Sequence, residues 1–101
     1  MTVKNSVPSL HSTLVDGVEI AWAEWGDKND PVLVLVHATG FHGRCWDQIA
    51  SKMGGFRVIA MDLRGHGQSA SNFPVSWEHF GRDVINFIVQ LDLRSILAAG
   101  H

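Results

Sequence analysis

Hydrophobic residues occur in short runs along this chain, and the runs differ in how often polar residues interrupt them. Residues 10–15 and 18–25 mix hydrophobic and polar positions, and Asp16-Gly17 separates them. Asp-Gly between two strand-like runs predicts a β-hairpin, because both residues tolerate the positive φ of a tight turn. Residues 32–36, 56–61 and 96–99 are almost continuously hydrophobic. The first two of these runs predict strands that are covered on both faces of a sheet, and the third predicts the last strand of the chain.

Two further segments carry hydrophobic residues at helical spacing. The first begins at Trp46 and follows the i, i+3, i+4, i+7 pattern to Met53, and the glycine pair that follows predicts its end. The second runs from about residue 76 to residue 91, with Ser76 as its expected N-cap. A hairpin followed by alternating strands and helices predicts the α/β class, with a mostly parallel sheet and helices on both faces.

Composition narrows the class of protein without naming a reaction. The 101 residues are 46% hydrophobic and 18% charged, as in a folded globular chain. A net charge of -2 gives no electrostatic reason to expect a nucleic-acid or membrane partner. One cysteine fits a reducing compartment, and neither a signal peptide nor a run long enough to span a membrane is visible. We therefore expect a cytoplasmic chain.

The segment around His37 carries the first candidate chemistry. Residues 35–40 read Leu-Val-His-Ala-Thr-Gly, and Trp46 follows nine residues after the histidine. This pattern resembles the H-G-x-G turn of the α/β-hydrolase superfamily, in which a backbone N–H of this turn enters the oxyanion hole. The resemblance places that donor on Thr39. It also implies substrate contacts for Ala38 and Phe41, and Ala38 departs from the usual glycine. Alanine would be strained there if the position required a positive φ.

Residues 62–69 are the second match. Asp-Leu-Arg-Gly-His-Gly-Gln-Ser is similar to the D-x-R-G-x-G-x-S loop of the same superfamily at every defined position. The resemblance implies a structural loop beside the active site, formed by Arg64, Gly65, His66 and Gly67. His66 is interpreted as structural, because the superfamily takes its general base from a histidine much later in the chain. The two glycines lack the continuation that a phosphate-binding loop needs.

The last residues, Gly100 and His101, follow an apolar run and resemble the start of a nucleophile elbow, G-x-S-x-G. The resemblance implies a sheet order of 1-2-4-3-5 and a nucleophile immediately after His101, absent from the chain. Residues 1–101 are then the N-terminal portion of a single α/β-hydrolase domain. The nucleophile, lid, acidic residue and catalytic histidine would lie in the remaining part, which is the expected macromolecular partner.

The resemblance implies an enzyme: a serine hydrolase of the carboxylesterase or lactonase kind, acting on a small-molecule ester or lactone through an acyl-enzyme. An aspartate nucleophile, as in haloalkane dehalogenases and epoxide hydrolases, is an alternative, although those relatives usually carry proline where Gly40 stands. A non-catalytic hydrolase-like binding protein is another. The isolated chain, whether a fragment or one part of a split hydrolase, is expected to be inactive.

The remaining candidate ligands point to no metal or cofactor. The six histidines form no H-x-x-x-H pair and have no cysteine partners. We expect His42 and Arg44 to be solvated loop residues and Cys45 to be packed and inert. The four tryptophans are expected to fill the core or cover the sheet.

Overall fold

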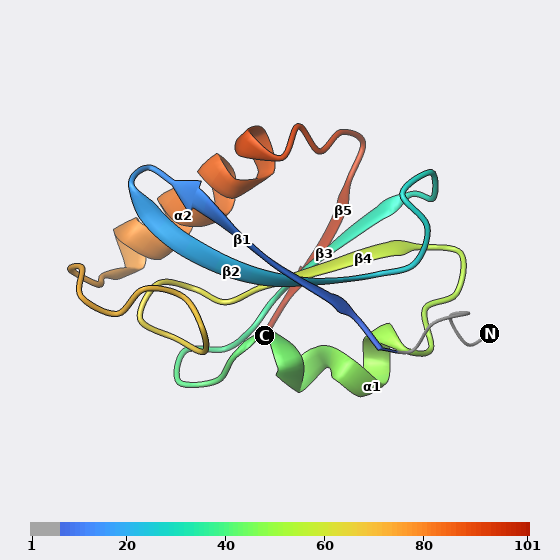
Figure 1. The fold of residues 1–101 in the computed structure, drawn as a ribbon, viewed down its shortest axis with the longest axis horizontal. Helices are drawn as coiled ribbons and strands as arrows, with labels where there is room; N and C mark the ends of the chain where they lie inside the picture. Colours follow the sequence, from blue (N-terminus) through green and yellow to red (C-terminus); the bar gives the residue numbers. More distant parts are fainter. Residues whose placement is uncertain (1–6) are drawn as a thin grey trace.

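The fold is one mixed sheet with helices on its two sides (Figure 1). A computed structural model describes residues 7–101. The described elements are, in chain order, β1 (Ser9–Val15), β2 (Val18–Trp25), β3 (Val32–Val36), the 3₁₀ helix η1 (Gly43–Trp46), α1 (Asp47–Ala50), β4 (Arg57–Met61), α2 (Trp77–Gln90) and β5 (Leu97–Gly100). The strands lie in the order β1-β2-β4-β3-β5. Both the predicted α/β class and the predicted strand order are confirmed.

The sheet combines an antiparallel hairpin with parallel strands. β1 and β2 pair up to Val15 opposite Val18, and the turn between them has a φ of +50° at Asp16 and +79° at Gly17. β2 then pairs antiparallel with β4, while β3 pairs in parallel with both β4 and β5. The carboxyl ends of β3, β4 and β5 therefore meet at one edge of the sheet, where ligands bind in open α/β sheets.

Alternate side chains of β3 enter two separate hydrophobic cores. Val34 packs in the core that contains Phe87 of α2, whereas Leu33 and Leu35 pack in the core that contains Ala50 of α1. Figure 1 shows α2 above the sheet and α1 below it. Burial on both faces explains why β3 has no polar alternation. The predicted helices on both faces are confirmed.

The long helix α2 begins at its predicted cap. The Ser76 hydroxyl accepts a hydrogen bond from the His79 N–H at 3.1 Å, which satisfies one backbone donor of the first turn. Phe87 is fully buried against the sheet. Trp77 is 77% exposed, so its predicted place in the core is wrong. It stands in the first turn, beyond the strands, and lines a hollow at the carboxyl ends of β3 and β5.

The helix predicted over residues 46–53 is much shorter in the structure. α1 has four residues, and after Ala50 the chain tightens into i−3 hydrogen bonds, including Met53 N–H to the Ala50 carbonyl at 3.1 Å. The 3₁₀ helix η1 also has three residues per turn. Gly43 and Trp46 therefore face the sheet, whereas Cys45 faces outward. Cys45 is exposed, so the prediction of a packed cysteine is wrong.

Candidate active site at the carboxyl end of the sheet

A tight turn follows β3 and presents its backbone to solvent. We call residues 37–42 the β3 loop. The Phe41 N–H donates to the Ala38 carbonyl at 3.0 Å, and Gly40 has a φ of +92°. A positive φ at the third residue is the mark of a type II turn and explains the glycine there. Ala38 is the first residue of this turn and does not have a positive φ, so alanine is unstrained at that position.

The turn leaves one backbone donor of interest unused. The Gly40 N–H donates to His66 Nε2 at 2.9 Å, and the Phe41 N–H is taken by the turn itself. Among residues 7–101, no group accepts the Thr39 N–H. Thr39 is exposed and lines a hollow of about 500 Å³ together with His101 and Trp77. A free N–H beside a hollow is the kind of donor that stabilises a developing oxyanion.

His37 ties the start of the β3 loop to the loop after β4. Its Nδ1 donates to the Ala38 carbonyl at 2.8 Å, and its Nε2 accepts the Leu63 N–H at 3.0 Å. These two bonds require the neutral imidazole with the proton on Nδ1. Burial lowers the pKa of His37, and the hydrogen bond to the Ala38 carbonyl opposes that shift only in part. With both nitrogens engaged, His37 has no free position for general-base chemistry.

His66 makes the same two kinds of contact from the other side. Its Nδ1 donates to the Arg64 carbonyl at 3.0 Å, while its Nε2 is the acceptor of the Gly40 N–H. The ring lies 5.0 Å from the His37 ring and 5.6 Å from the Phe80 ring, measured between centroids. Both histidines therefore hold backbone groups as neutral rings.

The loop over residues 62–69, the β4 loop, is fastened to neighbouring segments by hydrogen bonds of Asp62 and Ser69. The Asp62 carboxylate accepts the Gly43 N–H at 2.6 Å and the Gln68 N–H at 2.9 Å. The Ser69 hydroxyl donates to the Asp62 carbonyl at 2.6 Å and accepts the Ala21 N–H at 2.8 Å. Asp62 thus joins the loop to η1, and Ser69 joins it to β2.

Two glycines let the β4 loop reverse within a short length. Gly65 has a φ of +76° and Gly67 a φ of +50°, a region that favours glycine. A Cβ on Gly67 would overlap the Asp62 carboxylate, so the close approach excludes any side chain there. These constraints hold His66 at the position from which it reaches the β3 loop.

Arg64 connects the β4 loop to α2 through a contact that the sequence reasoning missed. Its guanidinium donates to both carboxylate oxygens of Asp83 at 2.7 Å, and Asp83 is fully buried. The Asp83 carboxylate raises the pKa of Arg64. The available signal was a charged residue between Phe80 and Phe87 on the hydrophobic face of α2, because a buried charge requires a partner.

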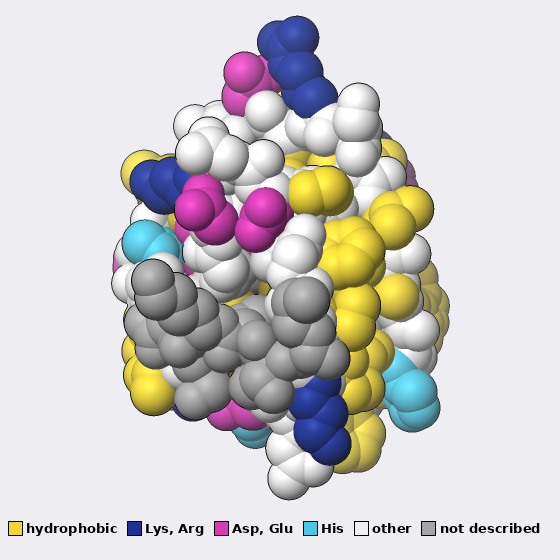
Figure 2. All heavy atoms as spheres, turned by 90° about the vertical axis from the view of Figure 1, so that its right-hand side faces the viewer, with side chains coloured by type: hydrophobic (Ala, Val, Ile, Leu, Met, Phe, Trp, Pro, Cys, Tyr) yellow, Lys and Arg dark blue, Asp and Glu magenta, His cyan; other side chains and the backbone are white. Residues whose placement is uncertain are grey.

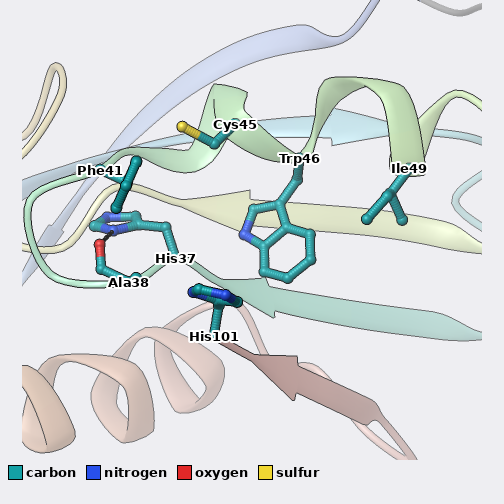
Figure 3. Close-up of a pocket in the computed structure, with 7 residues that line it drawn as sticks. All are labelled: His37, Ala38, Phe41, Cys45, Trp46, Ile49 and His101. Carbon is teal, nitrogen blue, oxygen red and sulfur yellow. Dashed lines mark hydrogen bonds between the residues drawn. The ribbon is translucent and has the colours of Figure 1, made fainter.

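The end of β5 lies against the β3 loop. Gly100 pairs with Val36, and the His101 N–H donates to the Val36 carbonyl at 3.1 Å. A second hollow of about 220 Å³ lies on the α1 side of this point, and Figure 3 shows Trp46 and Phe41 around it, with His101 at its lower edge. Ala38 and Phe41 both line this hollow. His37, Ala38 and His101 line both hollows, whereas Thr39 lines only the larger one.

Neither a metal centre nor a membrane span can be built from the described residues. Within residues 7–101, no three histidine, cysteine or acidic side chains are grouped as metal ligands would be. In the same range, no helix has the length and hydrophobicity that crossing a bilayer requires. Cys45 lies 3.9 Å from the His42 ring, on the exposed side of η1.

Comparison with known families decides which fold family these elements represent. Residues 33–101, which include both loops and the end of β5, match the alpha/beta hydrolase family. The chain belongs to the alpha/beta hydrolase family. This membership explains why the Thr39 turn, the β4 loop and the end of β5 occur together at one edge of the sheet.

Curated relatives of this alpha/beta hydrolase chain carry several enzymatic names. It is 36% identical to a non-heme chloroperoxidase of Burkholderia pyrrocinia over 88% of the chain and 33% of the relative. It is 32% identical to a bifunctional esterase/perhydrolase of Acinetobacter calcoaceticus, with the same coverage of both. A 3-oxoadipate enol-lactonase of Acinetobacter baylyi is 32% identical over 67% of the chain and 26% of the relative.

A solved structure gives the same result for the fold. A bacterial membrane phospholipase A superposes on the alpha/beta hydrolase chain with a TM-score of 0.89 and 30% identity, over 95% of the chain and 32% of the solved one. The chain thus spans about a third of the length of the proteins it matches.

Proposed function

We propose that the chain is the N-terminal portion of a serine hydrolase domain that cleaves a small-molecule carboxylic ester or lactone. The observation that carries the proposal concerns the Thr39 N–H: it has no acceptor among residues 7–101 while the next two N–H groups are engaged, and Thr39 lines a hollow. The esterase and enol-lactonase names of two relatives support the substrate class. The remaining part of the domain is the proposed partner of residues 1–101.

The proposed reaction assigns one step to this chain. A serine directly after His101 forms a bond from its Oγ to the carbonyl carbon, and its proton passes to a histidine in the remaining part of the domain. The carbonyl electron pair moves to oxygen, and the Thr39 N–H stabilises that oxyanion. Collapse expels the alcohol, which takes the proton from the histidine, and water releases the acid in a second cycle. Ala38 and Phe41 contact the substrate beside the reacting carbon.

Labelling with a fluorophosphonate tests this function. The whole protein should lose p-nitrophenyl acetate hydrolysis as one label is incorporated, and peptide mass spectrometry should place the label on the residue after His101. Heat-denatured protein is the control, because an unfolded serine is not activated. An aspartate at that position, or a folded protein that takes no label and hydrolyses no ester, would contradict the serine-hydrolase proposal. The second result would favour a binding protein.

A further inference from the structure

The β3 loop needs an external support, because its own hydrogen bonds fix only the turn. The Ala38 carbonyl accepts both the Phe41 N–H and His37 Nδ1, and these bonds set the plane of the Ala38–Thr39 peptide that carries the Thr39 N–H. Neither bond holds the following Thr39–Gly40 peptide or ties the tip of the loop to another segment. Gly40 follows directly, has a φ of +92°, and lacks a side chain that would restrict it. The position of Thr39 at the tip of the loop therefore depends on what holds the Thr39–Gly40 peptide.

His66 is the group that holds the Gly40 peptide. Its Nε2 accepts the Gly40 N–H at 2.9 Å, across 26 residues of sequence. Because Nε2 accepts, the ring proton must lie on Nδ1, and Nδ1 donates to the Arg64 carbonyl at 3.0 Å. The Arg64 carbonyl thus selects the tautomer that the Gly40 N–H requires.

The ring of His66 is itself fixed by rigid neighbours. Phe80 of α2 packs edge-on against it, and His37 lies on another side. Arg64, which carries the accepting carbonyl, is held to α2 by its two hydrogen bonds to buried Asp83. The support of the β3 loop therefore runs from α2 through Arg64 and His66 to the Gly40 peptide.

We propose that His66 is a positioning residue: as a neutral Nδ1–H imidazole it holds the Thr39–Gly40 peptide at the tip of the β3 loop and so keeps Thr39 and its N–H beside the reacting oxygen. The proposal rests on the proposed function of Thr39. A donor displaced from an oxyanion loses most of its effect within about 1 Å, so the loss of this support should reduce the rate of the chemical step more than substrate binding.

Two substitutions separate the hydrogen bond from the packing of the ring. His66→Phe keeps a ring against Phe80 but has no acceptor for the Gly40 N–H. His66→Gln places an amide oxygen close to the position of Nε2 and restores an acceptor. His11→Phe is the matched control, because His11 stacks on Trp22 of the hairpin at 4.3 Å and lies on the opposite edge of the sheet.

The first arm measures p-nitrophenyl acetate hydrolysis by the whole protein and its melting temperature. His66→Phe should lower kcat about tenfold to a hundredfold with KM within about twofold, as expected for a misplaced donor. His66→Gln should recover most of kcat, and His11→Phe should match the wild type. An unchanged kcat in His66→Phe would overturn the proposal, as would an equal loss in His66→Gln at an unchanged melting temperature.

The second arm does not depend on activity and therefore separates this proposal from the proposed function. Nitrogen NMR of the wild type should find the His66 proton on Nδ1, and the Gly40 amide should exchange slowly in the wild type and faster in His66→Phe. A proton on Nε2, or equal Gly40 exchange in both proteins, would overturn the role of His66. A wild type that hydrolyses no ester but shows the predicted NMR signature would contradict only the proposed function.

Discussion

Single residues of the β3 loop show how a short sequence motif is converted into geometry. Gly40 has the positive φ that the turn requires. Ala38 does not have a positive φ, and alanine is therefore accepted at a position where the superfamily usually has glycine. His37 and His66 each engage both ring nitrogens with backbone groups. The loop is thus built from two neutral imidazoles, and its integrity depends on their staying neutral.

Protonation of His37 should destabilise the fold. Its folded-state pKa is lowered from 6.5 by burial, so between that lowered value and 6.5 the unfolded chain binds more protons. The contribution of neutral His37 to stability is complete above pH 6.5 and is lost as the pH falls below it, at no more than about 1.4 kcal/mol per pH unit. Urea unfolding of the whole protein from pH 7.5 to about 5 should show a steeper loss in the wild type than in His37→Gln. Parallel pH profiles of the two proteins would contradict this role.

At the scale of elements, the β4 loop joins separate parts of the sheet and α2. Asp62 bonds to η1, Ser69 to β2, Arg64 to α2 and His66 to the β3 loop. The three polar residues that the sequence motif defines, Asp62, Arg64 and Ser69, therefore each bond to a different element. The glycines between them allow these side chains to point in different directions within one tight reversal.

The buried pair between Arg64 and Asp83 should matter far more than an exposed pair on the same helix. Asp83→Ala leaves the Arg64 guanidinium buried without its carboxylate and should lower the free energy of unfolding by about 3–5 kcal/mol. Arg82→Ala is the matched control, because Arg82 and Glu78 are largely exposed and such pairs contribute less than about 1 kcal/mol. Urea unfolding of the whole protein measures both. Equal decreases in the free energy of unfolding of the two variants would show that the buried pair contributes no more to stability than the exposed pair.

The elements differ in how far the sequence predicted them, and the reason is physical. β3 and α2 were predicted within a residue of their ends, because two-sided burial and a capped hydrophobic stripe leave clear patterns. The helix after Trp46 was overextended, since one hydrophobic stripe does not distinguish an α-helix from short turns with three residues each. The Arg64–Asp83 contact joins residues that are far apart in sequence, so only the fold could pair them.

At the scale of the whole molecule, hydrophobic side chains remain on the surface near α2 and β5. Ile85, Val89 and Leu97 are each more than half exposed. Figure 2 shows a continuous band of hydrophobic side chains on the face that it draws. β5 pairs with β3 on one side, and no described strand pairs with its other side. An open, apolar strand edge favours pairing with another chain.

Residues 1–101 alone should therefore self-associate and hydrolyse no p-nitrophenyl acetate. Sedimentation velocity should find oligomers or aggregates, and Leu97→Lys should reduce them because a charge on an edge strand opposes edge-to-edge pairing. A sample of residues 1–101 that stays monomeric and melts cooperatively would contradict this prediction.

The most direct test of the central claim concerns the main chain of Thr39 in the whole protein. Thr39→Ala keeps the N–H and should retain most of the wild-type kcat for p-nitrophenyl acetate. Thr39→Pro removes the N–H and should lower kcat by about 10²–10³-fold. Circular dichroism melting of both variants is the control for folding. Equal losses of kcat in two folded variants would assign the effect to the side chain and contradict the account of Thr39 as an oxyanion donor.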